Sequence, residues 1–149
     1  MNIVLYQPEI PGNTGNIARL CAATDTGLHL IAPLGFFLDD RHLKRAGLDY
    51  WPHVRLTVYN GIQELYDAYP EGRFYYLSSK AARPYTQVRY MEGDFLVFGP
   101  ETRGLPEDML AKNRDRTITI PMDGPVRSLN LSTSAGIVLY ESLRQVRGY

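Results

Sequence analysis

Three loops hold the residues whose types and spacing could do chemistry. In the first, residues 8–19, two prolines and a glycine build a stiff turn into a helix. Asn13 and Asn16 are polar groups near the start of that helix, and Arg19 stands in its second turn. The pattern fits a binding turn, and it fits equally a capped helix with a solvated arginine.

The second loop, residues 99–106, directly follows a predicted buried strand. It sets Glu101 and Arg103 between Gly99 and Gly104. A ligand could lie against the backbone at Gly99, because no side chain intervenes there. A turn with a local pair between the acid and the base is the plain alternative.

The third loop, residues 120–132, leads into the last predicted helix. Ser128, Asn130 and Ser132 crowd the entry to an otherwise apolar segment. A single helix cap needs only one such side chain, so the pattern favours a role beyond capping.

Composition and missing signatures exclude several classes of protein. The chain has 149 residues, and 16 basic residues balance 16 acidic ones, so bulk positive charge cannot hold a nucleic acid, although a local basic face can. Neither the dinucleotide nor the phosphate-loop glycine pattern occurs, and histidines and cysteine are not at metal-ligand spacing. The lone Cys21 lies on the apolar stripe of its helix and is expected in the core. With no apolar run near 20 residues and no signal segment, we expect a soluble cytoplasmic protein.

Short apolar runs alternate with helical patterns along the chain. Asn13 or Thr14 is expected to cap the first helix, and Gly27 to end it. This alternation predicts one α/β domain whose parallel sheet is covered by helices on both faces, with ligands beyond the carboxyl ends of the strands. Strands are predicted at 3–6, 28–32, 55–59, 74–77, 94–98 and 117–120, and helices at 14–25, 39–46, 60–69, 106–112 and 131–146.

In this order, the three loops resemble the three motifs of the SPOUT superfamily of RNA methyltransferases, in its SpoU/TrmH branch. Residues 13–19 resemble the first motif, 98–105 the second, and 120–122 with 128–132 the third. Residues 45–50 also resemble the minimal TrmL group, which methylates the ribose 2′-hydroxyl of cytidine or uridine 34, the wobble nucleotide of tRNA. The resemblance covers nearly the whole chain.

The resemblance implies a fold that general topology rules do not predict. Residues 1–149 would form a single SPOUT domain, a parallel sheet with helices on both faces and a deep C-terminal trefoil knot. It also implies S-adenosyl-L-methionine as cofactor, tRNA as partner and a homodimer, with no metal and no membrane. Methylation of another tRNA or rRNA position, or a non-catalytic module that binds RNA or a small ligand, are the alternatives.

The same resemblance implies roles for individual residues. Arg19 would activate the ribose hydroxyl as a transient base, or clamp the substrate phosphate, since a guanidinium normally keeps its proton. Tyr140 would lie at the dimer seam or contact RNA. The implied catalytic set is Arg19, Asn130, Ser128 and Glu101; the cofactor set is Leu77, Gly99, Glu101, Gly104, Ile120, Ser128 and Leu129; the substrate set is Asn13, Asn16, Arg19, Arg103 and Tyr140.

Two departures from the family pattern bear on RNA binding. Gly12 replaces a proline that is common before the first-motif asparagine, so this turn is expected to be looser. The chain is also expected to lack an appended RNA-binding domain, so the dimer itself must hold RNA. The candidate basic groups are Arg41, Lys44 and Arg45; Lys80 and Arg83; Arg127; and Arg144 and Arg147.

Overall fold

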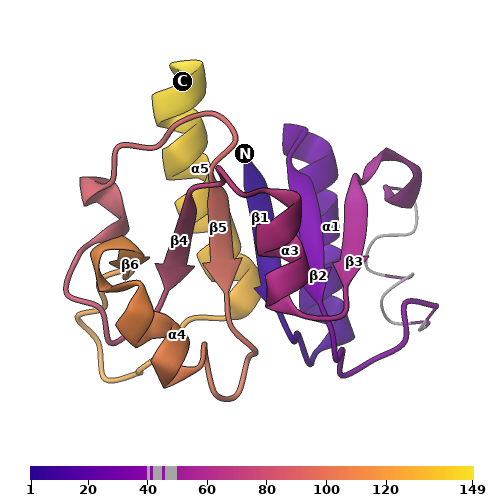
Figure 1. Ribbon diagram of the computed structural model, residues 1–149, viewed down its shortest axis with the longest axis horizontal. Helices are drawn as coiled ribbons and strands as arrows, with labels where there is room; N and C mark the ends of the chain where they lie inside the picture. The colour runs from indigo at the N-terminus through magenta and orange to yellow at the C-terminus, as the bar shows by residue number, and fades with distance from the viewer. Residues whose placement is uncertain (40, 42–44, 46–49) are drawn as a thin grey trace.

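A six-stranded parallel sheet in the order β3-β2-β1-β5-β4-β6 forms the centre of the computed structural model (Figure 1), which describes residues 1–39, 41, 45 and 50–149. Each neighbouring pair of strands runs parallel, as the alternation of apolar runs and helices predicts. The strands are β1 (Asn2–Tyr6), β2 (Gly27–Ile31), β3 (Leu56–Tyr59), β4 (Phe74–Leu77), β5 (Phe95–Phe98) and β6 (Thr117–Ile118).

Helices cover both faces of the sheet. In Figure 1, α1 and α5 lie behind it, and α3 and α4 lie in front. Within the described residues, none of the helices is long and apolar enough to cross a membrane. The helices are α1 (Pro11–Thr24), α3 (Ile62–Ala68), α4 (Glu107–Lys112) and α5 (Leu131–Arg147), with short 3₁₀ helices η1 (Trp51–His53), η2 (Tyr85–Gln87) and η3 (Arg114–Arg116).

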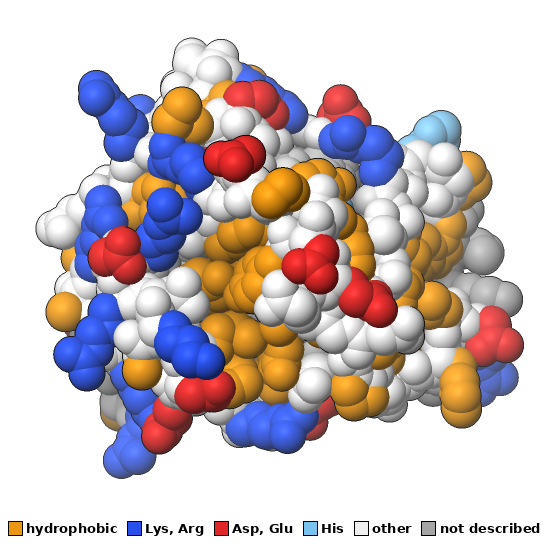
Figure 2. Space-filling model, in the orientation of Figure 1, with side chains coloured by type: hydrophobic (Ala, Val, Ile, Leu, Met, Phe, Trp, Pro, Cys, Tyr) orange, Lys and Arg blue, Asp and Glu red, His pale blue; other side chains and the backbone are white. Residues whose placement is uncertain are grey.

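The core has two layers because successive strand residues point to opposite faces. Behind the sheet, Ile17 and Cys21 of α1 and Leu139 of α5 pack on strand residues such as Ile3. In front, a second cluster of buried side chains includes Val4 and Leu65. Figure 2 shows part of this front layer open, with hydrophobic side chains gathered between α3 and α4. Burial on both faces explains why the strands are continuous apolar runs.

The ends of α1 differ from the predicted ends. The helix begins at Pro11, its N-cap is Ile10, and no side chain caps it. Proline suits the first turn because it has a fixed φ and needs no amide partner. Asn13, predicted as a cap, therefore lies inside the helix. The helix also ends before Gly27. Its last residue is Thr24, and its C-cap is Asp25, which has the left-handed conformation with φ +49°.

Other predicted ends move by a few residues. β6 stops at Ile118, and Thr119 instead bridges Pro84 of the β4–β5 connection. Of the three polar residues before α5, Asn130 is the cap, its Oδ1 accepting hydrogen bonds from the amides of Ser132 and Thr133 at 2.9 and 3.3 Å. The predicted helix at 39–46 and the family-like segment 45–50 fall mostly on residues outside the described part of the chain.

The strand order brings two of the candidate loops together. β1 lies between β2 and β5, so the sheet extends in one direction through β2 and in the other through β5. Crevices form at the carboxyl edge of such a switch point because the connections on either side diverge. The loops after β1 and β5, residues 8–19 and 99–106, both start at this edge of the sheet.

The pH dependence of stability should reflect His29, which is 4% exposed on β2. Its Nδ1 lies 3.1 Å from the Tyr59 hydroxyl and its Nε2 lies 3.1 Å from Asn2 Oδ1. Burial, with a smaller contribution from the charge of Arg55, lowers the pKa of His29 from 6.5 to about 4. Between these two values the unfolded chain binds a proton that the folded chain does not bind.

We therefore expect the free energy of unfolding to fall by up to about 3 kcal/mol as the pH drops from about 6.5 to 4. Chemical denaturation across this range measures it. In the H29Q variant, the contribution of His29 to the pH dependence of the unfolding free energy should disappear. The H53Q variant changes an exposed histidine and should retain the wild-type pH dependence. Equal slopes in the wild type and H29Q would contradict the prediction.

Candidate functional site

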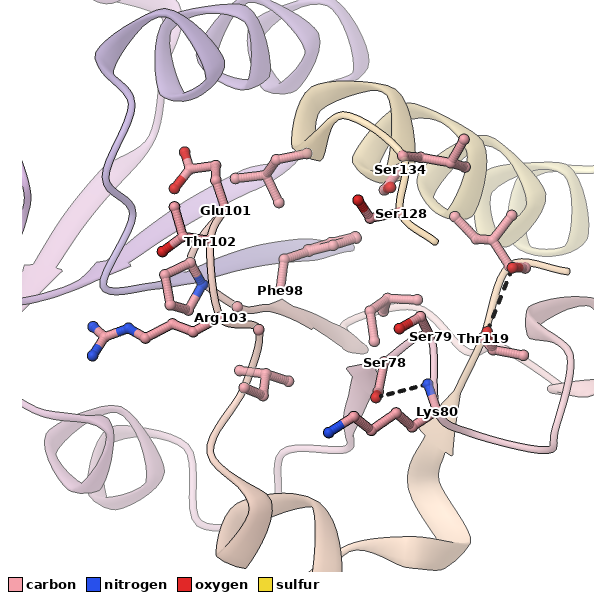
Figure 3. A pocket seen from close by; sticks show the side chains of 18 of the residues that line it. Ser78, Ser79, Lys80, Phe98, Glu101, Thr102, Arg103, Thr119, Ser128 and Ser134 are labelled. Carbon is pink, nitrogen blue, oxygen red and sulfur yellow. Dashed lines mark hydrogen bonds between the residues drawn. The ribbon is translucent and has the colours of Figure 1, made fainter. Parts of the chain in front are cut away.

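A cavity of about 330 Å³ opens at the carboxyl edge of β4, β5 and β6. We call it the edge cavity (Figure 3). Its walls come from residues 77–80 after β4, 98–105 after β5, and 119–134 around the start of α5. The second and third candidate loops thus line one space, although 13 residues separate them in the sequence.

Glycine shapes the floor of the edge cavity. A Cβ atom on Gly99 would lie 2.4 Å from the carbonyl carbon of Gly104 and 2.4 Å from the amide nitrogen of Leu105. Gly104 has a φ of +68°, and its amide donates a 3.0 Å hydrogen bond to the carbonyl of Pro100. The loop can fold back on itself only because position 99 has no side chain and position 104 tolerates a positive φ.

Glu101 joins the second loop to the first. Its carboxylate accepts hydrogen bonds from the backbone amides of Glu9 at 2.8 Å and Ile10 at 3.1 Å. It also accepts one from Asn13 Nδ2 at 3.4 Å. In return, the Thr102 hydroxyl donates to the carboxylate of Glu9 at 2.8 Å. Hydrogen bonds to a charged acceptor are stronger than neutral ones, so the loops after β1 and β5 hold each other in place.

Asn13 then links the first loop to the third. Its Oδ1 accepts a 3.0 Å hydrogen bond from Asn130 Nδ2, and Asn130 Oδ1 accepts the capping amides of α5. The side-chain amide of Asn13 can take only one orientation in this series of hydrogen bonds. A carboxylate accepts only, so Nδ2 of Asn13 must face Glu101, and its Oδ1 therefore faces Asn130. We call Glu101, Asn13 and Asn130 the loop junction.

Every residue predicted for the cofactor lines the edge cavity: Leu77, Gly99, Glu101, Gly104, Ile120, Ser128 and Leu129. Arg103 of the predicted substrate set lines it as well. Its guanidinium, however, donates to Gln7 Oε1 at 3.1 Å and points away from the interior in Figure 3. Glu101 faces the first loop, so the local Glu101–Arg103 pair is not the arrangement that forms.

The remaining substrate candidates lie outside the lining of the edge cavity. Asn13 is buried in the loop junction, whereas Asn16, Arg19 and Tyr140 are exposed on α1 and α5. The guanidinium of Arg19 lies over the ring of Tyr50, 4.8 Å from its centroid. This contact with an aromatic face restrains the side chain and keeps it on the surface.

Several lining residues were missed by sequence reasoning. Ser78, Ser79 and Lys80 follow Leu77 at the end of β4, so the position of that strand was a usable signal. Leu110 of α4 and Ser134 of α5 gave no such signal, because only the packing of these helices brings them to the cavity.

The lining suits an organic ligand better than a metal ion. Apolar walls from Phe98, Leu105 and Leu131 face hydroxyl groups such as that of Ser128. This mixture fits a molecule with a flat apolar part and several polar groups. In the described part of the chain, no group of three His, Cys, Asp or Glu side chains could hold a metal ion. Burial raises the pKa of the Cys21 thiol to about 12, so this cysteine stays a neutral core residue.

Comparisons with known proteins agree with this geometry. Residues 1–140 match the model of the SpoU rRNA Methylase family. A protein of Escherichia coli K12 named tRNA (cytidine(34)-2'-O)-methyltransferase is 47% identical over 150 residues, covering 100% of this chain and 95% of its own. A solved structure described as giving insights into 2-OH methylation of C/U34 on tRNA superposes with a TM-score of 0.95 at 50% identity, covering 99% of this chain and 97% of its own.

A more distant structure shows the same fold. The SpoU methyltransferase AviRb of Streptomyces viridochromogenes, solved in complex with the cofactor AdoMet, superposes with a TM-score of 0.87 at 23% identity. It covers 97% of this chain, and this chain covers 60% of it. With a family match over nearly its whole length and a relative of 47% identity, the chain belongs to the SpoU rRNA Methylase family.

Proposed function

We propose that this protein is an S-adenosylmethionine-dependent methyltransferase acting on the ribose 2′-oxygen of cytidine or uridine 34 of tRNA. The observation that carries the proposal is that the second and third motif loops line one cavity, while Asn13 of the first motif loop is hydrogen-bonded to both of them. The names of the Escherichia coli relative and of the 50% identical structure support this substrate. Two alternatives are methylation of another tRNA or rRNA position and a binding module without turnover. The experiment below distinguishes both from the proposed activity.

The edge cavity is the proposed site of the methyl donor, held by the lining residues named above. S-adenosylmethionine supplies a methyl group on a sulfonium, which is already electrophilic. The backbone around Gly99 allows close approach because no side chain intervenes, while Phe98 and Leu131 offer apolar walls. These walls exclude water from the site of transfer and strengthen the polar contacts that remain.

The protein must also align the acceptor hydroxyl in line with the methyl group and remove its proton. We propose that Arg19 acts on the reacting 2′-hydroxyl, that Ser128 lies at the cavity mouth, and that Asn16 and Arg103 are further RNA contacts. The guanidinium of Arg19 is exposed and normally keeps its proton, so we favour its role as a phosphate clamp that orients the ribose and not as a transient base. The hydroxyl proton then passes to solvent at the cavity mouth as the methyl group is transferred. Glu101 and Asn130 are positioning residues, since their polar atoms are engaged in the loop junction.

A homodimer of single-domain chains completes the proposal. Apolar side chains stay exposed around the start of α1, at the entry to α5 and along α5: Ile10 at 47%, Leu129 at 37% and Tyr140 at 50%. A second copy covering these surfaces would remove them from water. Arg19 does not line the edge cavity of its own chain, so a guanidinium brought by the partner chain is the arrangement we favour.

We also propose the trefoil knot for the C-terminal part. Residues of the β4–β5 connection pair across the end of β6: the Thr119 amide donates to the carbonyl of Arg83 at 2.9 Å, and the Tyr85 amide donates to the carbonyl of Thr119 at 2.8 Å. From that edge the chain returns to the middle of the sheet, where α5 packs on α1 and β5. The pairing with the β4–β5 connection and the return to the middle of the sheet support a knotted path.

The activity is tested directly with labelled S-adenosylmethionine and unmodified tRNA transcripts. We expect label in the ribose of nucleotide 34, located by nuclease digestion and mass spectrometry. Label at another tRNA nucleotide, or label only in ribosomal RNA when this is offered instead, would show that the protein has a different substrate. A folded protein that binds the cofactor and transfers nothing to any RNA would favour the non-catalytic module.

Removal of the Arg19 guanidinium should abolish transfer. We expect R19A to lose at least about 100-fold in kcat, because the acceptor hydroxyl loses its orienting or proton-accepting group. Cofactor affinity, measured by calorimetry, should stay within about twofold of wild type, since Arg19 lies outside the cavity lining. R55A, the same change just before the far edge strand β3, is the matched control. Full activity in R19A would remove this residue from the mechanism.

A methyl group at position 99 should damage the cavity. In G99A the new Cβ would meet backbone atoms at 2.4 Å, so the turn must shift at a cost of about 1–3 kcal/mol in unfolding free energy. Cofactor affinity should fall at least tenfold by calorimetry. G61A introduces its Cβ into open space and should leave affinity unchanged. Wild-type affinity in G99A would argue against this loop as the cofactor floor.

A further inference from the structure

A second, larger cavity of about 520 Å³ lies beside the edge cavity. The two share Ser78, Lys80 and Leu110 in their walls. Lys80, Arg83 and Arg114 bring three positive charges to this second cavity, against the single carboxylate of Glu107. We call it the basic cleft. Figure 2 shows Lys and Arg side chains gathered at this end of the molecule, over β6 and α4.

The positive charge of Arg83 is fixed in place. Its guanidinium donates to the carbonyl oxygens of Asp115 at 3.2 Å and Gln87 at 2.8 Å. Its own carbonyl accepts the amide of Thr119, which anchors the backbone to the end of β6. Both acceptors of the guanidinium are neutral, so these bonds orient the charge without cancelling it. The guanidinium is therefore preorganised, and its remaining N–H groups can donate to an anion.

Carboxylates neutralise little of the positive charge of the cleft. Among the described residues, neither Arg83 nor Arg114 has a carboxylate within salt-bridge distance. Lys80 pairs with Glu107 at 3.4 Å, but their side chains are 76% and 89% exposed. Such exposed pairs contribute at most about 1 kcal/mol, so a phosphate can replace the carboxylate. Residues 78–90 contain three basic residues and no acidic one.

We infer that the basic cleft binds backbone phosphates of the tRNA next to the nucleotide whose ribose meets the methyl donor at the mouth of the edge cavity. This inference rests on the proposed function. The edge cavity and the basic cleft share a wall, so phosphates that neighbour a ribose at the cavity mouth come within reach of the cations of the cleft. The chain has no net charge, so phosphate attraction has to come from such local concentrations of cations.

The test uses the full chain with R83Q, R114Q and their double variant, against R55Q at the opposite edge of the sheet. Arg114 is exposed, so R114Q should fold even if R83Q is destabilised; thermal unfolding checks both. We expect the double variant to raise the KM for tRNA about tenfold, with kcat and the calorimetric Kd for S-adenosylmethionine within about twofold. R55Q should match wild type in all three.

Direct tRNA binding, measured by fluorescence anisotropy against salt concentration, keeps the test independent of turnover. Each removed cation should make the slope of log affinity against log salt shallower by about one. Wild-type slope and KM in the double variant would overturn the inference. The inference would also be overturned if the double variant lost binding of inorganic phosphate but kept the wild-type affinity for tRNA. The cleft would then bind free phosphate only. A wild-type protein that transfers no methyl group would instead refute the proposed function, while the binding slopes still decide on the cleft.

Discussion

The hydrogen bonds of Asn13 hold the candidate site together. One side of its amide donates to the carboxylate of Glu101, and the other accepts from Asn130. The residue is 7% exposed, so water cannot replace these partners without rearrangement of the loops. A buried amide whose two sides are both engaged is costly to leave unpaired, and this cost favours the single arrangement in which all three loops meet.

The parallel sheet makes such a junction possible. Strands that run in one direction place every carboxyl end at one edge, and β1 and β5 are neighbours in the sheet, so the loops that follow them start side by side. The edge cavity lies at the carboxyl edge of β5, β4 and β6. Backbone and small side chains form much of its lining, so the turns of the chain give the cavity its shape.

Positive charge is distributed unevenly on this neutral protein. Arg19 sits on α1 over Tyr50, while Lys80, Arg83 and Arg114 surround a separate cleft at the other end of the carboxyl edge. A molecule without net charge can attract a polyanion only through such local groups. Arginines held by carbonyl oxygens, as Arg83 is, keep their charge while losing their mobility. Position, and not total charge, thus governs where this protein can attract a polyanion.

The sequence alone determined the strands, most helices and the three loops, because these depend on local periodicity, on proline and glycine, and on capping side chains such as Asn130. It indicated the cofactor residues through a family resemblance, and those residues do line one cavity. It could not predict that Asn13 is a buried connector and not a helix cap, because that role needs Glu101 and Asn130 from distant parts of the chain. It named Lys80 and Arg83 as candidate basic groups, but it could not predict that Arg114 joins them around one cleft, or that Leu110 and Ser134 line the edge cavity. These depend on which helices and connections pack side by side, and only the tertiary structure decides that.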